Sequence, residues 1–349
     1  MPLFTVAIPT YNRAEMLTHT IACVLQQTFG DFELVISDNG SPDHTAEAVA
    51  RFRDPRIRYI RHPENRGGMF NWSHCTDVAV GDWFVFNQDD DLLCPFFLER
   101  CANAIRKHPD IVMYATECTM SRDVRSLFRT SIGNFPLHHH WDKTQPRIIP
   151  GLQVAAMTFF TTGFFPPAQA FPTPLIRKHF PRRDGELLAD RYITWRIAIE
   201  GDVAFEAYIG ALLGDHGTRY TVTHAESCNR SPSVNAERMA AHCQEHHLDW
   251  QSALRNMVPE MPREFRDWVL ETQILVRNIP TEAFEIVAED HAREQGISPA
   301  EWVMQKKAQK IRDLQPPAPP PVPRLDRLGL PRPMIRVLRK ILSLLGKKY

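Results

Sequence analysis

Apolar runs alternate with segments of helical periodicity along the N-terminal part of the chain. Residues 3–10 and 32–36 are short apolar runs followed by polar, turn-forming residues, which is typical of buried strands. Residues 13–29 between them carry apolar side chains at helical spacing, which predicts one helix face packed on a sheet. Further strands are predicted at 57–61 and 82–87, again separated by helical segments. This alternation predicts a parallel sheet with helices on both faces.

The rest of the chain divides less regularly. Residues 111–117 predict a strand, whereas much of 121–174 is expected to be irregular. Residues 186–201 have a helical period, and residues 231–314 are predicted to be mostly helical. The proline-rich segment 315–324 is expected to form an extended, semi-rigid linker.

The last residues, 325–349, form a basic amphipathic tail. One face of its predicted helix is apolar and the other carries arginines and lysines; the apolar residues are Ile335, Leu338, Leu342 and Leu345. Such a helix suits the surface of an anionic membrane and is too short to cross one. The alternative is a helix docked on the protein's own body or on a partner subunit.

Composition narrows the class of protein. Lys plus Arg and Asp plus Glu both number 41, so no net charge indicates a nucleic acid partner. The seven cysteines include no C-x-x-C pair, which favours a reducing compartment over a disulfide framework or a zinc site. No signal peptide and no apolar run of roughly 20 residues is evident. We therefore expect a cytoplasmic protein, peripheral on the inner face of the cell membrane through its tail.

The segment "VFNQDDDLL", residues 85–93, places three consecutive carboxylates at the end of a predicted strand. Asp89, Asp90 and Asp91 repel one another, so a counter-charge is needed to keep all three ionised. A divalent cation would supply it; the alternative is an acidic turn that caps the next helix, predicted over 95–105. The polar clusters "PTYNR" and "SDNGSPD" also follow strands. Ligands bind beyond the carboxyl ends of parallel strands, so this convergence favours a functional site.

Two histidine clusters carry weaker signals. The run of three histidines at 138–140 is expected to be a solvated turn, because adjacent loop residues rarely converge on one ion. His242 and His246 have the i, i+4 spacing of a ligand pair, with His247 beside them. An exposed helical face is the favoured interpretation.

Together, the segments resemble the family 2 glycosyltransferases of the GT-A fold, which transfer a sugar from a nucleotide donor with inversion. The likeness covers residues 3 to about 230. The motifs that carry it are "VAIPTYNRAEMLTHTIACVLQQTFGDFELVISDNGSPDHT", "ENRGGMFN", "AVGDWFVFNQDDDLLCPFFLE", "LADRYITWRI" and, most loosely, "YTVTHAESCNRS". The resemblance implies an α/β fold, with a Rossmann-like, mostly parallel sheet, flanking helices and a C-terminal helical extension.

The resemblance also implies a domain plan and a donor site. Residues 1–230 would be the catalytic domain, with a nucleotide-binding half (1–105), an acceptor half (106–230) and a helical extension (231–314). The implied donor-binding residues are Pro9, Thr10, Tyr11, Arg13, Asp38, Asn65, Gly67, Asn71 and Asp89. The first four would form the base pocket, with Tyr11 offering an aromatic face; the alternative for Tyr11 is simple packing.

A divalent cation, Mn²⁺ or Mg²⁺, is implied as the cofactor. Asp90, Asp91 and His224 would hold it, since these cations prefer oxygen ligands and neutralise a leaving diphosphate. The family often has D-x-D-D, and Gln88 stands where the first Asp would be. The role of the first aspartate of the motif must therefore pass to Asp89 or be partly lost.

Asp190 is implied as the catalytic base that takes the proton from the acceptor hydroxyl. From the residues alone, a helix N-cap is the better interpretation of Asp190. The family usually has Glu-Asp where this chain has Ala189 and Asp190.

The implied function is inverting transfer of a sugar from a nucleotide-diphosphate sugar to a glycan or lipid-linked acceptor, in surface polysaccharide or lipopolysaccharide synthesis. The alternative is a degenerate scaffold that binds nucleotide sugars without turnover, with Gln88 and Ala189 as its signs. A nucleotidyltransferase is disfavoured, because no Gly-rich loop and Lys follow the first strand.

Overall fold

The computed structural model describes residues 1–121, 145–160, 168–180, 189–214, 225–275 and 279–314. The chain divides into two compact units, residues 1–303 and 304–349. The predicted linker, the amphipathic tail and the histidine run at 138–140 lie outside the described residues. Among the described helices, none is both long and apolar enough to span a bilayer.

The described strands are β1 (Phe4–Thr10), β2 (Phe32–Asp38), β3 (Ile57–Arg61), β4 (Trp83–Phe86), β5 (Leu92–Leu93), β6 (Ile111–Ser121), β7 (Arg147–Ile149), β8 (Gln169–Pro172) and β9 (Asp202–Gly214). The helices between them are α1 (Ala14–Leu25), α2 (Thr45–Ala50), α3 (Gly68–Val78), α4 (Phe97–Lys107), α5 (Gly151–Met157), α6 (Thr173–His179) and α7 (Ala189–Ala198). The C-terminal helices are α9 (Ala225–Glu245), α10 (Trp250–Met257), the 3-10 turn η2 (Val258–Glu260), α11 (Arg263–Trp268), the π-helical turn η3 (Val269–Gln273), α12 (Thr281–Val287), α13 (Glu289–Gln295) and α14 (Pro299–Leu314).

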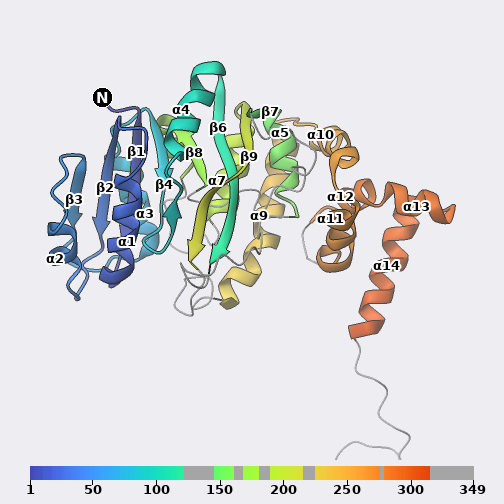
Figure 1. The fold of residues 1–349 in the computed structure, drawn as a ribbon. Helices are drawn as coiled ribbons and strands as arrows, with labels where there is room; N and C mark the ends of the chain where they lie inside the picture. Colours follow the sequence, from blue (N-terminus) through green and yellow to red (C-terminus); the bar gives the residue numbers. More distant parts are fainter. Residues whose placement is uncertain (122–144, 161–167, 181–188, 215–224, 276–278, 315–349) are drawn as a thin grey trace, which may run out of the picture. The chain divides into compact units, whose positions relative to one another are not determined.

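One sheet runs through the larger unit in the order β3-β2-β1-β4-β8-β6-β9-β5, with β7 also paired to β9 (Figure 1). The pairs β3–β2, β2–β1 and β1–β4 are parallel. Strand β8 is antiparallel to both β4 and β6, and β9 is parallel to β6. Strands β6 and β9 therefore run in the same direction as the first four. The prediction of an α/β fold with a mostly parallel sheet is confirmed.

Two apolar layers enclose the N-terminal half of the sheet. Alternate residues of a strand point to opposite faces, and those of β1 are shared between the layers accordingly. Val6 and Ile8 pack with Leu17 of α1 in one layer. Ala7 packs with Cys75 of α3 in the other. The sheet is thus covered on both faces, as the alternation of strands and helices predicted.

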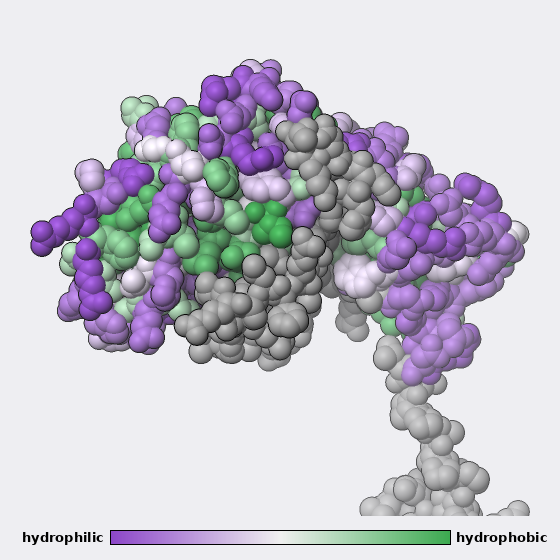
Figure 2. All heavy atoms as spheres, in the orientation of Figure 1, coloured by the Kyte–Doolittle hydropathy of each residue, from purple (hydrophilic) through white to green (hydrophobic). Residues whose placement is uncertain are grey.

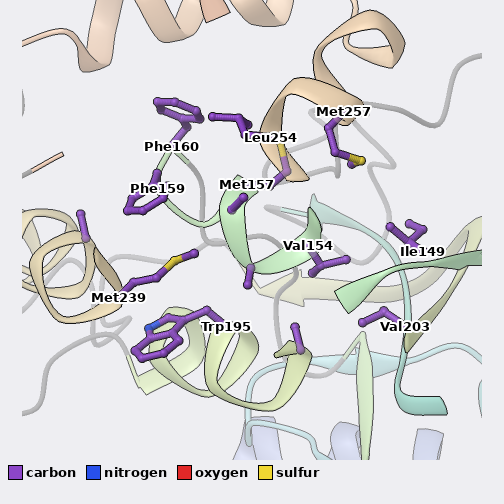
Figure 3. Close-up of a cluster of buried hydrophobic side chains, with 14 of the residues drawn as sticks. Ile149, Val154, Met157, Phe159, Phe160, Trp195, Val203, Met239, Leu254 and Met257 are labelled. Carbon is purple, nitrogen blue, oxygen red and sulfur yellow. The ribbon is translucent and has the colours of Figure 1, made fainter. Parts of the chain in front are cut away.

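The helices that follow the sheet share its core. Figure 3 shows Met239 of α9 and Leu254 of α10 in one cluster with Met157 of α5 and Trp195 of α7. All these side chains are at most 2 % exposed. Helices α9 to α13 therefore belong to the same compact unit as the sheet. In contrast, the face of α13 that Figure 2 shows carries hydrophilic side chains of its own.

The expectation of an irregular segment over much of 121–174 is wrong for its described part. That part contains β7, α5, β8 and the start of α6. Strand β9, of 13 residues, was also not predicted, and its pairing with β6 has register shifts. Short strands and a bulged ladder give weak periodicity. The positions of these strands in the sheet depend on pairing with segments that are distant in the sequence.

Candidate active site

The acidic segment after β4 lies beside the segment after β1, because these strands pair in parallel with Ala7 opposite Phe86. Thr10 donates its hydroxyl to Oδ2 of Asp89 at 2.8 Å. Nη1 of Arg13 lies 2.9 Å from Oδ1 of Asp89 and 2.8 Å from Oδ2 of Asp90. The counter-charge of the acidic segment in this structure is therefore an arginine.

Asp89 is held from several sides. The residue is 5 % exposed, and its backbone carbonyl accepts a hydrogen bond from the Thr20 hydroxyl at 3.0 Å. Burial raises the pKa of Asp89 to about 6, although the Arg13 guanidinium and the Thr10 hydroxyl act in the opposite direction. Arg13, Thr10 and Thr20 therefore all hold Asp89 in place.

Asp91 has a different partner. Its Oδ1 accepts a hydrogen bond from the backbone N–H of Gly214, the last residue of β9, at 3.0 Å. The interpretation of the aspartates as a helix cap is not supported. Helix α4 begins at Phe97, and its cap residue, Phe96, makes no side-chain cap hydrogen bond.

Asp38 ends β2 and is fully buried. Its Oδ1 accepts from the N–H of Ser41 at 2.8 Å, and its Oδ2 accepts from the hydroxyl of Tyr59 at 2.5 Å. Nε of Arg61 lies 3.7 Å from Oδ2. Burial and the neighbouring Asp38 carboxylate raise the pKa of Tyr59, which keeps the phenol as a donor.

Asn71 ties the ends of β1 and β2 together. Its Oδ1 accepts from the Ser37 hydroxyl at 2.6 Å, and its Nδ2 donates to the carbonyls of Ser37 at 2.9 Å and Thr10 at 3.3 Å. The side chain comes from α3, whose first turn follows Gly67. Gly67 has φ +88°, a conformation that glycine adopts at little cost.

The loop before α3 is fixed by Asn39. The amide of Asn39 donates to Oδ1 of Asn65 at 2.8 Å and to the carbonyl of Gly67 at 3.1 Å. Tyr11, by contrast, is 42 % exposed at the same edge of the sheet. Pro9 lies within β1, paired with Ser37 of β2. The residues for which the sequence predicted a role in donor binding, from Pro9 to Asp89, therefore lie at one edge of the sheet.

Asp190 is the second residue of α7; the residue keeps some exposed surface, but its carboxyl group is buried. Its Oδ1 accepts from the N–H of Arg191 at 2.8 Å, and burial raises the pKa of its carboxyl group. Thr194, one turn on, lies 3.4 Å from Nε2 of Gln169 in β8. Because β8 is antiparallel to β4, Gln169 lies toward the carboxyl end of β4. Thr194, in the middle of α7, therefore lies beside the carboxyl end of β4.

His224 lies outside the described residues. The ligand atoms of His242, Glu245 and His246 lie within 4.8 Å of one another. However, Nη1 of Arg196 is 3.0 Å from Nδ1 of His242, and a guanidinium in that place disfavours a second cation. His246 and His247 are exposed and His242 is partly buried, so only part of this cluster forms the expected exposed face.

Sequence reasoning missed three residues that build the site: Thr20, Asn39 and Tyr59. Asn39 stands inside the cluster "SDNGSPD", so its position was a usable signal. Tyr59 is a single aromatic residue in an apolar strand, and Thr20 is one polar position on a helix. Their roles depend on contacts over 21 and 69 positions of sequence, which no local pattern reports.

Comparison with known proteins shows what the chain is similar to. The family model "Glycosyl transferase family 2" matches residues 5–160. A PGL/p-HBAD biosynthesis glycosyltransferase of Mycobacterium bovis (strain BCG / Pasteur 1173P2) is 34% identical over 129 residues, which are 36% of this chain and 50% of that protein. A GalNAc(5)-diNAcBac-PP-undecaprenol beta-1,3-glucosyltransferase of Campylobacter jejuni is 34% identical over 96 residues, 27% of this chain and 31% of that protein.

Among solved structures, S. aureus TarS in complex with UDP-GlcNAc aligns with a TM-score of 0.54. The identity is 15%, and the alignment covers 84% of this chain and 92% of that one, so it is a likeness of fold. The chain spans about half the length, or less, of the curated relatives it matches. Residues 5–160 therefore match the family 2 glycosyltransferases in sequence, and the described fold is like that of the GT-A glycosyltransferases. Its relatives are glycosyltransferases of glycan biosynthesis.

Proposed function

We propose that the chain is an inverting glycosyltransferase that moves a sugar from a nucleotide-diphosphate sugar to an acceptor hydroxyl. The observation that carries the proposal is the convergence of Asp38, Asn71, Asp89 and Asp90 at the carboxyl ends of β1, β2 and β4. Ligands of open parallel sheets bind at this edge. TarS, which shares the fold, was solved with UDP-GlcNAc.

The nucleotide is assigned to the β1–β2 side of this edge. Tyr11 offers an exposed aromatic face for a base, and the buried Asp38 stands at the end of the neighbouring strand. Asn65 and Gly67 shape the loop beside it, where the backbone can approach a ligand closely. This set binds a base and a ribose without selecting one base.

A divalent cation, Mn²⁺ or Mg²⁺, fits the acidic segment. One oxygen of Asp89 and one of Asp90 lie within 2.9 Å of the same nitrogen, so two hard oxygen ligands already converge on one cation. Asp90 and Asp89 would hold the metal, with Asp91 supporting the loop from its bond to Gly214; His224 is retained as a further contact. Bound there, the cation would neutralise the charge that develops on the leaving diphosphate.

Asp190 is assigned as the base. As the acceptor oxygen attacks the anomeric carbon, the bond from that carbon to the diphosphate oxygen breaks on the opposite face. The acceptor proton passes to the Asp190 carboxylate. A direct displacement of this kind inverts the configuration. The raised pKa of Asp190 makes it a stronger base than an exposed aspartate.

The acceptor is proposed to be a glycan or a lipid-linked glycan of surface polysaccharide or lipopolysaccharide synthesis. One relative is named for an undecaprenol diphosphate substrate. The basic tail 325–349 would hold the protein at an anionic membrane surface on its cytoplasmic side. Sedimentation with anionic and with neutral liposomes tests this part. The 349-residue chain should sediment only with the anionic vesicles, and equal partitioning would remove the membrane proposal.

Product stereochemistry tests the reaction. A purified donor and a panel of lipid-linked acceptors are incubated with the protein, and the new glycosidic bond is examined by NMR. A product with the anomeric configuration opposite to that of the donor supports inversion, and the same configuration contradicts it. Donor binding with no transfer to any acceptor would instead favour the degenerate scaffold, to which Gln88 and Ala189 point.

A further inference from the structure

One guanidinium nitrogen bridges both carboxylates of the acidic segment. Nη1 of Arg13 lies 2.9 Å from Asp89 and 2.8 Å from Asp90. The side chains of the two aspartates are only 7% and 11% exposed, so solvent screens this pairing weakly. Arg13 was expected in the base pocket, but its charged end is directed to the carboxylates instead.

We propose that Arg13 is a resident counter-cation that competes with a divalent cation for the oxygens of Asp89 and Asp90. The proposal rests on the proposed function, because the divalent cation belongs to that site. With Arg13 in place, the two carboxylates and the guanidinium sum to one negative charge. Adding a divalent ion to this set would place two cations within a few ångströms, where they repel strongly. The ion therefore binds well only when Arg13 leaves.

In the proposed exchange the guanidinium leaves while the backbone stays in place. The N–H groups on either side of Arg13 are fixed: that of Asn12 donates to the Ser41 hydroxyl at 2.9 Å, and that of Ala14 donates to Asp43 at 3.1 Å. The Arg13 side chain is 23% exposed, so rotation about its own bonds can carry it away from the carboxylates. Arg13 is therefore a movable charge on a fixed loop.

A nucleoside diphosphate would provide the new partner. Phosphoryl oxygens accept paired hydrogen bonds from a guanidinium, so Arg13 can exchange one anion for another. The nucleotide then draws Arg13 off the aspartates while the divalent ion takes its place. Cation and nucleotide binding are thereby coupled through one side chain, and the coupling is the same in both directions.

Titration of Mn²⁺ without nucleotide, followed by the EPR signal of the free ion, tests the proposal on the full chain. Arg13→Gln should bind Mn²⁺ about tenfold or more tightly than the wild type, since one repelling charge has been removed. Arg13→Lys should stay close to the wild type. The matched control is Arg56→Gln, which removes an arginine of similar exposure, 27%, paired with Asp54 at 2.8 Å. It should leave Mn²⁺ affinity unchanged.

Mn²⁺ binding by Arg13→Gln that is no tighter than that of the wild type would overturn the proposal, as would equal gains in Arg13→Gln and Arg56→Gln. Arg13→Met repeats the test with a different uncharged side chain if the Gln variant does not fold. UDP, GDP and TDP are added in a second series. They should raise Mn²⁺ affinity more in the wild type than in Arg13→Gln, and an equal rise would contradict the coupling. A wild type that binds none of the three with Mn²⁺ would remove the proposed function, whereas the nucleotide-free titrations would still decide the role of Arg13.

Discussion

The hydroxyl of Tyr59 donates to Oδ2 of Asp38 at 2.5 Å, and Asp38 is fully buried. A buried carboxylate that loses a donor keeps its desolvation cost, so Tyr59→Phe should lower the free energy of unfolding by about 1–3 kcal/mol. Urea unfolding measures this change. The control is Tyr11→Phe, because Tyr11 is 42 % exposed and no buried group depends on its hydroxyl in the described contacts. That variant should lose much less, and equal losses in the two variants would contradict a special role for the Tyr59 bond.

Asn71→Ala should destabilise the protein through the ends of β1 and β2. The change leaves the Ser37 hydroxyl and the carbonyls of Ser37 and Thr10 without the amide that now pairs with them. The expected loss in urea unfolding is about 2–3 kcal/mol, because Asn71 is only 3% exposed. Asn103→Ala, on the exposed face of α4, is the control and should stay within about 0.5 kcal/mol of the wild type. Similar values for the two variants would show that Asn71 is not a structural tie.

Asp190→Asn should slow sugar transfer by roughly 10²- to 10⁴-fold while leaving the Kd of the donor unchanged. The amide can still accept the hydrogen bond from the Arg191 N–H but cannot take the acceptor proton. Single-turnover rates and donor titrations separate the two effects. Asp202→Asn, at the exposed start of β9, is the matched control and should transfer sugar at the wild-type rate. Wild-type transfer by Asp190→Asn would show that the base is another group.

The pH dependence of transfer should follow Asp190. Only the ionised carboxylate accepts a proton, and burial raises its pKa above the ordinary 3.8. The rate of the chemical step should therefore be full above the raised pKa and fall as the pH is lowered through it. Single-turnover rates with saturating donor, followed from neutral pH down to the lowest pH at which the protein stays folded, measure this limb. Burial raises the pKa of Asp89 to about 6, so its protonation can weaken donor binding in the same pH range. Saturating donor removes this effect on binding from the measured rate. A rate that stays flat over this range would contradict the assignment.

The N-terminal half of the fold could be predicted from the sequence because each strand and helix there carries its own period. The buried strand around Val6 and the amphipathic helix around Leu17 are examples, and both pack in the predicted way. The order of the strands could not be predicted in this way. Strand β1 lies between β2 and β4, and the alternation of strands and helices does not specify that β4 pairs with β1. The antiparallel insertion of β8 between β4 and β6 is likewise decided by distant pairing.

The same limit applies to the site. The polar clusters that contain Asp38 and Asp89 could be located because each directly follows an apolar strand. The contact of Arg13 with Asp89 could not be predicted, since it spans 76 positions and depends on the pairing of β1 with β4. The sequence raised the question of what neutralises three aspartates and pointed to a metal. The structure adds an arginine, which changes how a metal would bind.

The most direct test of the central claim is calorimetric titration of UDP, GDP and TDP into the wild type and into Asp90→Ala, each with and without Mn²⁺. One nucleotide should bind tightly, Mn²⁺ should strengthen this binding, and Asp90→Ala should lose the effect of the metal. The bound nucleotide would then name the donor class. Absence of binding, or binding indifferent to both Mn²⁺ and Asp90, would contradict the assignment of the acidic segment as the donor and metal site.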